Sequence, residues 1–354
     1  MILRIKNFIL NSVKNLALNL RIKKYKYVHI MFNDKFNKPF VDFLNKKFNK
    51  QEHFVLCKRW YNEHPFPEGS NVAEIANLRF LNFSKNKKII CHSLFDKELI
   101  NYLYKHKDIL KTKAYWIIWG GDLYDAERDE KNDYVRCNFK GYLSDIDKNF
   151  FEEKFSIKKE NFHKFFYKFP ITLNMIRMTH KINKTYIKIQ INNSADKSTL
   201  QMLEILSKFK DENIRITTIL SYGETEFNNE IIQKGKEIFK NKFEYIDKYM
   251  TPQEYAQHLA QNDILVLCQN RQQGFGNTLC SLMLGSKVYI KNEISVYNYL
   301  NTSGLKIFDT NEIYKLNFKE FVLNDFVELN RTKVSKYYDD SYLSGLLMRA
   351  LKCK

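Results

Sequence analysis

Polar side chains gather around a short glycine turn in the second half of the chain. An apolar run at residues 264–268 (ILVLC) is followed by Gln-Asn-Arg-Gln-Gln and then by Gly274 and Gly276. Two glycines that open a helix directly after a strand indicate a tight turn or a close approach of the backbone to a ligand. The amides at such a helix start, together with the positive end of the helix dipole, bind phosphate groups.

Arg271 precedes this turn and can bind a diphosphate through two parallel hydrogen bonds. We therefore predict a diphosphate-binding loop in which Arg271 is catalytic through its positive charge. The predicted loop comprises Arg271, Gln272, Gln273, Gly274, Phe275, Gly276 and Asn277. The alternative is a strand-to-helix turn that needs glycine only for its own geometry.

Two more polar loops follow predicted strands of the same half. Residues 192–198 (NNSADKS) follow the strand at 186–191, and Asn192 and Ser194 offer amide and hydroxyl donors to an anion. Capping of the next helix by Asp196 or Ser198 explains this loop equally well. Tyr222 and Gly223 follow the strand at 214–220. Because the carboxyl ends of parallel strands share one edge of a sheet, all these loops are expected to form one site.

The first half carries a second candidate site, formed by Trp119, Gly120, Gly121, Asp122 and Tyr124 after the apolar run 115–118. Aromatic rings beside a carboxylate suit a sugar, because sugar rings stack on aromatic faces and sugar hydroxyls donate to carboxylates. A tight turn with a surface aspartate is the alternative.

A reaction that inverts a sugar's configuration needs a general base, and the first half offers Asp122 and His92 for it. His92 follows the apolar run 88–91, although a lone histidine is more often structural. No metal site is predicted, because the acidic segment 122–130 and the six scattered cysteines lack metal-ligand spacing. The cysteine pattern indicates reduced thiols in a cytosolic protein.

Short apolar runs that alternate with helical patterns must position these loops. Strands are predicted at 27–32, 88–91 and 115–119, and again at 186–191, 214–220, 243–246, 264–268 and 287–290. Such alternation predicts parallel sheets with helical crossovers, which is an α/β fold of two Rossmann-like domains facing a central cleft. The predicted parts are an amphipathic helix at 1–26, an acceptor-side domain at 27–175, a nucleotide-binding domain at 176–330 and a C-terminal helix at 331–354. The linker is expected within 165–184.

The first 24 residues predict a basic amphipathic helix. Apolar residues fall on one side of it, and no acidic residue precedes Asp34. Such a helix binds an anionic membrane interface, although packing on the protein's own core is the alternative. No apolar run is long enough to span a membrane.

The net charge of +18 requires an anionic partner, for which a lipid surface, a phosphorylated substrate and nucleic acid all qualify. Nucleic acid is the less favoured partner, because the basic residues are spread along the chain and the aromatic residues follow strand patterns.

Residues 249–290 resemble the carboxyl-terminal signature of GT-B glycosyltransferases. Together, WGGDLY, NNSADKS, TPQEYAQHLAQNDI and RQQGFGNTLC resemble the bacterial family 56 glycosyltransferases, the 4-acetamido-4,6-dideoxygalactose (N-acetylfucosamine) transferases. The resemblance covers residues 27–300. It implies sugar transfer from a nucleoside diphosphate, dTDP, to a lipid-diphosphate-linked saccharide at the cytoplasmic face of the inner membrane. The nucleotide sugar is then a co-substrate, and no cofactor is obligatory.

The resemblance also implies that Ile246 and Asp247 border the nucleobase. In large GT-B families a glutamate precedes the glycine turn and another follows eight residues later, whereas this chain has Gln273 and Ser281 there. Ser281 is thereby the residue expected near the ribose. These missing glutamates leave open a protein that binds a nucleotide sugar without transferring it.

Overall fold

The computed structural model describes residues 15–60, 64–75, 77–125, 128–192, 197–221 and 225–353, with only the backbone for 225 and 226. The chain forms two compact units. Unit 1 contains Met1–Pro170 and Asp340–Lys354, and unit 2 contains Ile171–Asp339. The first boundary falls inside the expected linker, five residues before the predicted domain limit. The second differs from expectation, because residues 331–354 do not form one C-terminal helix but are divided between the units.

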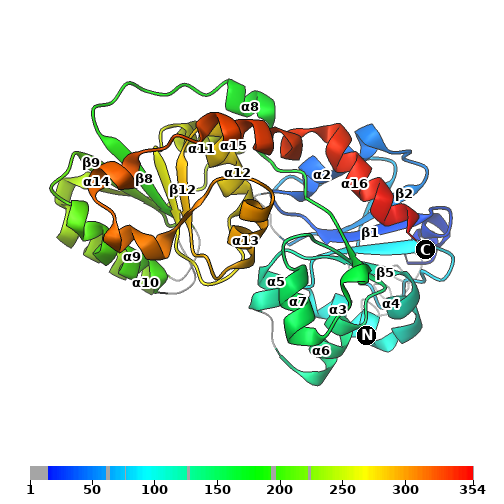
Figure 1. Ribbon diagram of the computed structural model, residues 1–354. Helices are drawn as coiled ribbons and strands as arrows, with labels where there is room; N and C mark the ends of the chain where they lie inside the picture. Colours follow the sequence, from blue (N-terminus) through cyan, green and yellow to red (C-terminus); the bar gives the residue numbers. More distant parts are fainter. Residues whose placement is uncertain are drawn as a thin grey trace, which may run out of the picture. The chain divides into compact units, whose positions relative to one another are not determined.

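Unit 1 is built on a seven-stranded sheet with strand order β3-β2-β1-β4-β5-β6-β7, and every strand pair is parallel. Helices cover both faces of this sheet: α2 and α16 lie on one face, and α3, α6 and α7 on the other (Figure 1). The elements are β1 (Tyr27–Phe32), α2 (Asn37–Lys47), β2 (His53–Lys58), β3 (Val72–Glu74), β4 (Lys88–His92), α3 (Lys97–Lys105), α4 (Lys107–Lys113), β5 (Ala114–Ile117), α5 (Gly121–Tyr124), α6 (Glu130–Cys137), β6 (Gly141–Leu143), α7 (Lys148–Phe155), β7 (Phe162–His163) and α16 (Asp340–Lys352).

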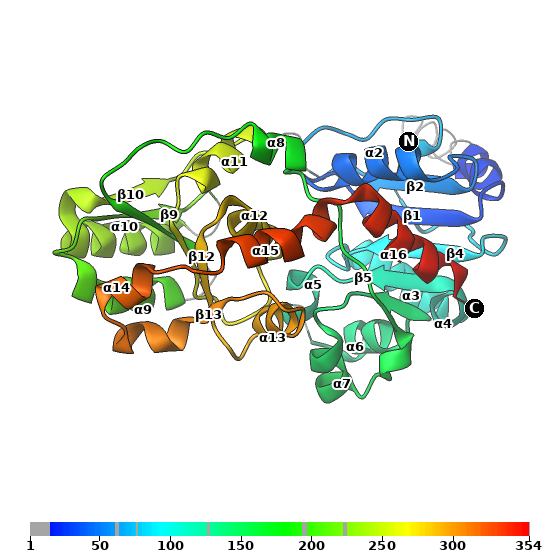
Figure 2. The same ribbon diagram turned by 45° about the horizontal axis from the view of Figure 1, so that its top comes forward.

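Unit 2 is built on a six-stranded parallel sheet with strand order β10-β9-β8-β11-β12-β13. Figure 2 shows α9 and α10 on one face of this sheet and α11 and α12 on the other. The elements are α8 (Leu173–Arg177), β8 (Ile187–Asn192), α9 (Ser198–Leu206), β9 (Ile214–Ile219), α10 (Thr225–Phe239), β10 (Phe243–Ile246), α11 (Pro252–Ala260), β11 (Ile264–Leu267), α12 (Phe275–Leu284), β12 (Lys287–Ile290), α13 (Ser295–Thr302), β13 (Phe308–Asp309), α14 (Phe318–Val322) and α15 (Val327–Val334).

The predicted strands are confirmed, and their apolar runs form the two cores. β1 and β11 are buried on both faces, as expected for central parallel strands covered by helices on each side. Register places Tyr27 beside both His53 and Lys88, and Leu267 beside both Asn192 and Ile290. The loops after these strands therefore meet at one edge of each sheet.

The helix at residues 15–22 packs on unit 1 at its end. Ile22 is fully buried, and the side-chain amide of Asn86 donates to the carbonyl of Ile22 at 2.9 Å. Leu16 and Leu20 remain 63% and 56% exposed. The rest of the predicted amphipathic helix, residues 1–14, lies outside the described residues. Within the described ranges, no helix combines the length and apolar character needed to cross a bilayer.

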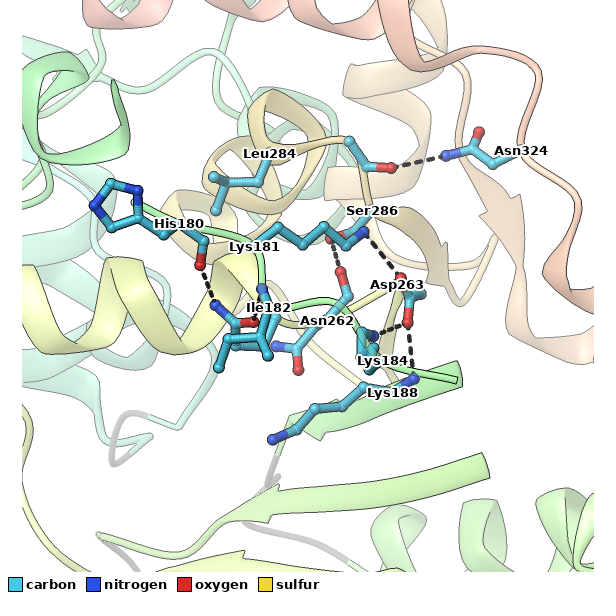
Figure 3. Close-up of polar contacts among 12 residues, drawn as sticks. His180, Lys181, Ile182, Lys184, Lys188, Asn262, Asp263, Leu284, Ser286 and Asn324 are labelled. Carbon is cyan, nitrogen blue, oxygen red and sulfur yellow. Dashed lines mark hydrogen bonds and ion pairs between the residues drawn. The ribbon is translucent and has the colours of Figure 1, made fainter. Parts of the chain in front are cut away.

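The segment that leads from α8 to β8 is fastened to unit 2. Figure 3 shows Asp263 paired with Lys181 Nζ at 2.9 Å and with Lys184 Nζ, while its carboxylate accepts from the backbone amide of Lys188 at 2.8 Å. The carbonyl of His180 accepts from the side-chain amides of Gln257 in α11 and of Gln261 just after it, both at 2.7 Å. These contacts assign residues 180–188 to unit 2 rather than to a free linker.

Helix α16 is held on unit 1 by two lysines. Lys168 Nζ pairs with Asp340 at 2.5 Å, at the start of the helix. The buried Lys88 Nζ donates to the carbonyls of Ala350 at 3.0 Å and Cys353 at 2.7 Å, at its other end, and to Tyr115 Oη at 2.6 Å. Burial lowers the pKa of Lys88 to about 8.

Candidate functional site

The glycine turn of unit 2 is confirmed as the start of helix α12. Gly274 has a φ of 71°, and a Cβ there would lie 2.8 Å from Leu267 Cδ2 and 3.0 Å from Asn192 Nδ2. Glycine is therefore required both by the backbone angle and by the close approach of β8 and β11. None of the described side chains caps the helix start, and its first turn holds no acidic residue. The first amides of α12 thus keep their capacity to bind an anion.

Three glutamine side chains beside this turn carry oxygens without a hydrogen-bond partner among the described residues. These oxygens are Oε1 of Gln269, Gln272 and Gln273. Gln269 is 1% exposed, and its Nε2 donates to the carbonyl of Gln273 at 3.0 Å. Leaving a buried polar atom unpaired costs about 1–3 kcal/mol, so such a group is normally explained by a partner that the protein alone does not provide. The turn is therefore built for a polar ligand.

Arg271 is half-buried in this loop, and its Nη1 donates to the carbonyl of Gln272 at 3.3 Å. Gly276 and Asn277 are partly exposed in the first turn of α12, whereas Phe275 is buried. Phe275 packs edge-on against Tyr299 and Tyr337, with ring centroids 6.0 Å apart in both pairs. It anchors the helix start, so its role is structural rather than ligand binding.

Ser281 differs from the expectation of a ribose contact. It lies inside α12 with no exposed surface, and its hydroxyl has no partner among the described residues. Ile246 ends β10, and Asp247, which follows it, is exposed at the same sheet edge. Both remain predicted neighbours of the nucleobase.

Asn192 ends β8 and is buried beside Gly274. Three other predicted donor-site residues, Ser194, Tyr222 and Gly223, lie outside the described residues.

In unit 1, the carboxylate of Asp122 is buried and surrounded by donors. Its Oδ2 accepts from the Leu94 amide at 3.0 Å and from Trp116 Nε1 at 2.8 Å, and its Oδ1 accepts from the Trp119 amide at 3.0 Å. The residue is 1% exposed, and burial raises its pKa to about 6. As it lies, Asp122 ties β4, β5 and the following turn together. Because these donors occupy both oxygens, we assign Asp122 a structural role rather than that of the general base.

The turn around Asp122 is aromatic, as the sequence indicates. Gly120 has a φ of 90°, and Trp119 packs against Phe36 and Tyr167 with ring centroids 4.9 and 5.0 Å apart. Trp119 Nε1 is buried and has no acceptor among the described residues. Tyr124 Oη donates to Asp147 at 3.0 Å, which directs this hydroxyl toward the protein rather than a ligand.

His92 is buried and bonded through both ring nitrogens. Its Nε2 lies 2.9 Å from His29 Nδ1, and its Nδ1 lies 2.8 Å from Tyr167 Oη. Burial lowers the pKa of His92 to about 3. A base must have a free lone pair facing the substrate, so this arrangement gives His92 a structural role.

The sequence reasoning missed Asp34, a carboxylate at the carboxyl end of β1. Its Oδ1 accepts from the amides of Phe36 at 2.7 Å and Asn37 at 3.1 Å, at the start of α2. Burial raises the pKa of Asp34 to about 6. The sequence feature that could have identified Asp34 is its place after a predicted strand: Asn33 and Asp34 follow the run 27–32, as Asn192 follows the run 186–191 in unit 2.

The described part of the chain contains no cluster of three or more His, Cys, Asp or Glu side chains arranged to hold a metal ion. The described residues supply anion binding at α12, hydrogen bonding, aromatic stacking and a buried carboxylate at Asp34.

Comparisons with known proteins agree with this arrangement. The family model described as 4-alpha-L-fucosyltransferase glycosyl transferase group 56 matches residues 61–348. No curated protein matches the sequence. Several solved structures share the fold. HepE of Anabaena, solved with UDP and glucose, is 10% identical with a TM-score of 0.66, covering 92% of this chain and 99% of its own.

A glycosyltransferase of Rickettsia africae is 10% identical with a TM-score of 0.62, covering 93% of this chain and 98% of its own. WaaG, a glycosyltransferase involved in lipopolysaccharide biosynthesis, is 9% identical with a TM-score of 0.55, covering 92% and 98%. At such low identity these likenesses show the fold alone. Together with the two parallel sheets they establish the predicted GT-B architecture of two Rossmann-like domains.

Proposed function

Because the chain belongs to glycosyltransferase group 56, we propose that it moves a deoxysugar from a dTDP donor to a lipid-diphosphate-linked saccharide. The sugar proposed is 4-acetamido-4,6-dideoxygalactose or a close relative. The observation that carries the donor half of this proposal is the uncapped start of α12, flanked by unpaired glutamine oxygens.

Unit 2 would bind the nucleotide sugar at this helix start. The amides of α12 and the guanidinium of Arg271 place positive charge where the bond to the sugar breaks and negative charge grows on the departing diphosphate. Hydrogen bonds to such a charge strengthen as it develops, so these groups favour the transition state over the bound donor. The partly exposed amides of Gln272 and Gln273 would fix the nucleotide beside them.

Support for a membrane-bound acceptor comes from the outer surface of unit 1. Leu16, Leu20 and Phe80 are 63%, 56% and 52% exposed. The side-chain amide of Asn19 donates to the carbonyl of Phe80 at 2.8 Å and so links the helix that carries Leu16 and Leu20 to Phe80. The segments 15–26 and 79–87 contain no acidic residue. Their exposed cations are Arg21, Lys23, Lys24, Lys26, Arg79, Lys85 and Lys87.

An apolar patch within a basic surround matches the interface of an anionic bilayer. We therefore place the enzyme, as a proposal, on the cytoplasmic face of the inner membrane, where a lipid-linked saccharide would be within reach.

The donor half is tested by calorimetric titration of the purified protein with dTDP, UDP, GDP and thymidine. We expect dTDP to bind at least tenfold more tightly than thymidine, because the diphosphate supplies the charge that α12 and Arg271 bind. Equal affinity for dTDP and thymidine would contradict the proposed site. Binding without release of dTDP from the sugar nucleotide in the presence of acceptor would instead indicate a nucleotide-sugar-binding protein.

A further inference from the structure

Asp34 differs from the buried Asp122 in that its hydrogen bonds with the described residues use only one carboxylate oxygen. Both of its hydrogen bonds, from the amides of Phe36 and Asn37, use Oδ1. None of the described residues donates to Oδ2, whereas both oxygens of Asp122 accept hydrogen bonds. Asp34 thus combines a fixed position at the start of α2 with an oxygen that can accept from a ligand.

Two exposed aromatic rings pack against Phe32, two residues before Asp34. The ring of Phe32 lies between Trp60 and Phe95, with centroids 4.3 and 6.3 Å away. Trp60 and Phe95 are 42% and 43% exposed, so part of each ring is accessible to a ligand. The Trp60 amide donates to the side chain of Asn33 at 2.6 Å, so Trp60 is tied to the residue next to Asp34.

A second aromatic group lies on the side of β5. The ring of Phe36, whose amide bonds to Asp34, packs edge-on against Trp119 with centroids 4.9 Å apart. Phe95 lies over the same turn, because a Cβ on Gly121 would come within 3.1 Å of its ring. The carboxyl edge of the unit 1 sheet thus presents aromatic faces around one carboxylate.

We propose that Trp60, Phe95 and Asp34 form the acceptor-saccharide subsite, with Asp34 as the general base for the acceptor hydroxyl. Sugar rings would stack on Trp60 and Phe95, since the apolar face of a sugar packs on aromatic rings. This inference rests on the proposed function, for which it supplies the missing base.

The step proposed is a direct displacement with inversion at the anomeric carbon. The acceptor hydroxyl gives its proton to Asp34 Oδ2, and its oxygen forms the new bond to the anomeric carbon. The bond from that carbon to the diphosphate oxygen breaks, and its electron pair leaves with the nucleoside diphosphate. The carboxyl then returns the proton to water.

The surroundings of Asp34 suit a base that works near neutral pH. Burial raises its pKa to about 6, while the cation of Lys35 acts in the opposite direction. The other titratable groups that face it are Cys57 and Tyr167, whose pKa values are both raised by burial. These two stay neutral at pH 7, so Asp34 is ionised above about pH 6 and protonated below it.

The test compares Asp34→Asn with Asp129→Asn. Each aspartate accepts from the backbone at the start of a helix, Asp34 at α2 and Asp129 at α6, and asparagine keeps an acceptor oxygen at both positions. Asp129 differs in being exposed. Initial rates are measured with a dTDP-deoxysugar and a short-chain prenyl-diphosphate disaccharide. We expect Asp34→Asn to lower kcat at least a hundredfold with an unchanged Kd for dTDP. Asp129→Asn should equal the wild type.

Two further measurements separate catalysis from a structural role. The wild-type rate should fall as the pH drops through 6, because a protonated carboxyl cannot accept the proton, and the residual rate of Asp34→Asn should lack this limb. Trp60→Ala and Phe95→Ala should each raise the KM for the disaccharide about tenfold, with little change in kcat.

Wild-type kcat in Asp34→Asn would overturn the inference, as would an equal loss in Asp129→Asn. Failure of the proposed function looks different, because the wild-type protein itself would then neither bind dTDP nor release it from the donor.

Discussion

His29 Nδ1 lies 2.9 Å from His92 Nε2, inside the unit 1 sheet, and His29 Nε2 lies 3.0 Å from His53 Nδ1. Tyr167 Oη donates to Asn37 Oδ1 at 2.8 Å, so it accepts from His92 Nδ1. Each imidazole therefore carries its proton on Nδ1 and donates to the next group along. The chain of donors is complete only while His29 and His92 are neutral, since a proton added to Nε2 of either ring would face the N–H group of its neighbour.

This chain predicts that unit 1 is sensitive to acid. Burial lowers the pKa of His53 to about 4 and of His92 to about 3, below the ordinary value near 6.5. Below pH 6.5 these histidines therefore bind protons in the unfolded chain but not in the folded chain. The free energy of unfolding falls by about 2 kcal/mol per histidine at pH 5. In His53→Asn, which keeps a donor in place of Nδ1, the melting temperature should fall about 4–8 °C less between pH 7 and pH 5 than in the wild type.

The control for this measurement is His106→Asn, at a half-buried histidine outside this chain of rings, which should follow the wild-type pH dependence. An unchanged acid slope in His53→Asn would show that the buried ring is not held neutral.

Asp122→Ala tests the structural role of that carboxylate. The substitution leaves the amides of Leu94 and Trp119 and the indole of Trp116 without their acceptor. Unpaired buried donors cost about 1–3 kcal/mol each, so the free energy of unfolding in urea should fall by about 3 kcal/mol or more. Asp133→Ala removes a surface pair with Arg128 and should cost less than about 1 kcal/mol. A similar loss in both variants would refute the role assigned to Asp122.

Arg271→Ala should weaken binding of dTDP about ten- to a hundredfold, because it removes a charge-assisted contact to the diphosphate. Arg271→Lys should recover only part of this affinity, since an ammonium cannot form the planar pair of hydrogen bonds. Thymidine, titrated in the same calorimeter, should bind both variants as it binds the wild type. If thymidine and dTDP affinities fall together, Arg271 supports the loop through the carbonyl of Gln272 instead.

Replacing Leu16, Leu20 and Phe80 together by serine should release the protein from phosphatidylglycerol vesicles in a sedimentation assay. These side chains supply the exposed apolar area of the patch, while the cations around them are kept. Leu323 and Leu329 of unit 2, at 53% and 43% exposed, give the matched control when changed to serine. Sedimentation that survives the triple change, or that is lost equally in the control, would argue against this surface as the membrane contact.

Much of the fold could be predicted, because central parallel strands have continuous apolar sequences. β1 and β12 have the predicted limits, and β11 ends one residue earlier. β2 was not predicted, because its apolar run FVLC is short and is bounded by the polar residues His53 and Lys58. The membership of α16 in unit 1 could not be predicted, because it depends on a contact between Lys88 and residues 262 and 265 positions away.

Of the candidate sites, the glycine turn at the start of α12 could be predicted, and the burial of the carboxylates could not. Gly274 was recognised from its place between a strand and a helix. The roles of Asp122 and Asp34 depend instead on how many donors converge on each carboxylate, which only the three-dimensional arrangement reveals. Taking the residues after every predicted strand as site candidates would have included Asp34. It would not have shown that its Oδ2 receives no hydrogen bond from the described residues.

The division of unit 1 also sets an order of events during synthesis. Residues 171–339 are a contiguous insertion, so unit 2 has its whole sequence available while the ribosome is still making the end of the chain. Unit 1 cannot complete its folding before α16 is synthesised. Until residues 350 and 353 emerge, the ammonium of Lys88 lacks two of its three acceptors. A nascent chain stopped at residue 339 would therefore carry a complete unit 2 and an incomplete unit 1, and unit 1 would fold last.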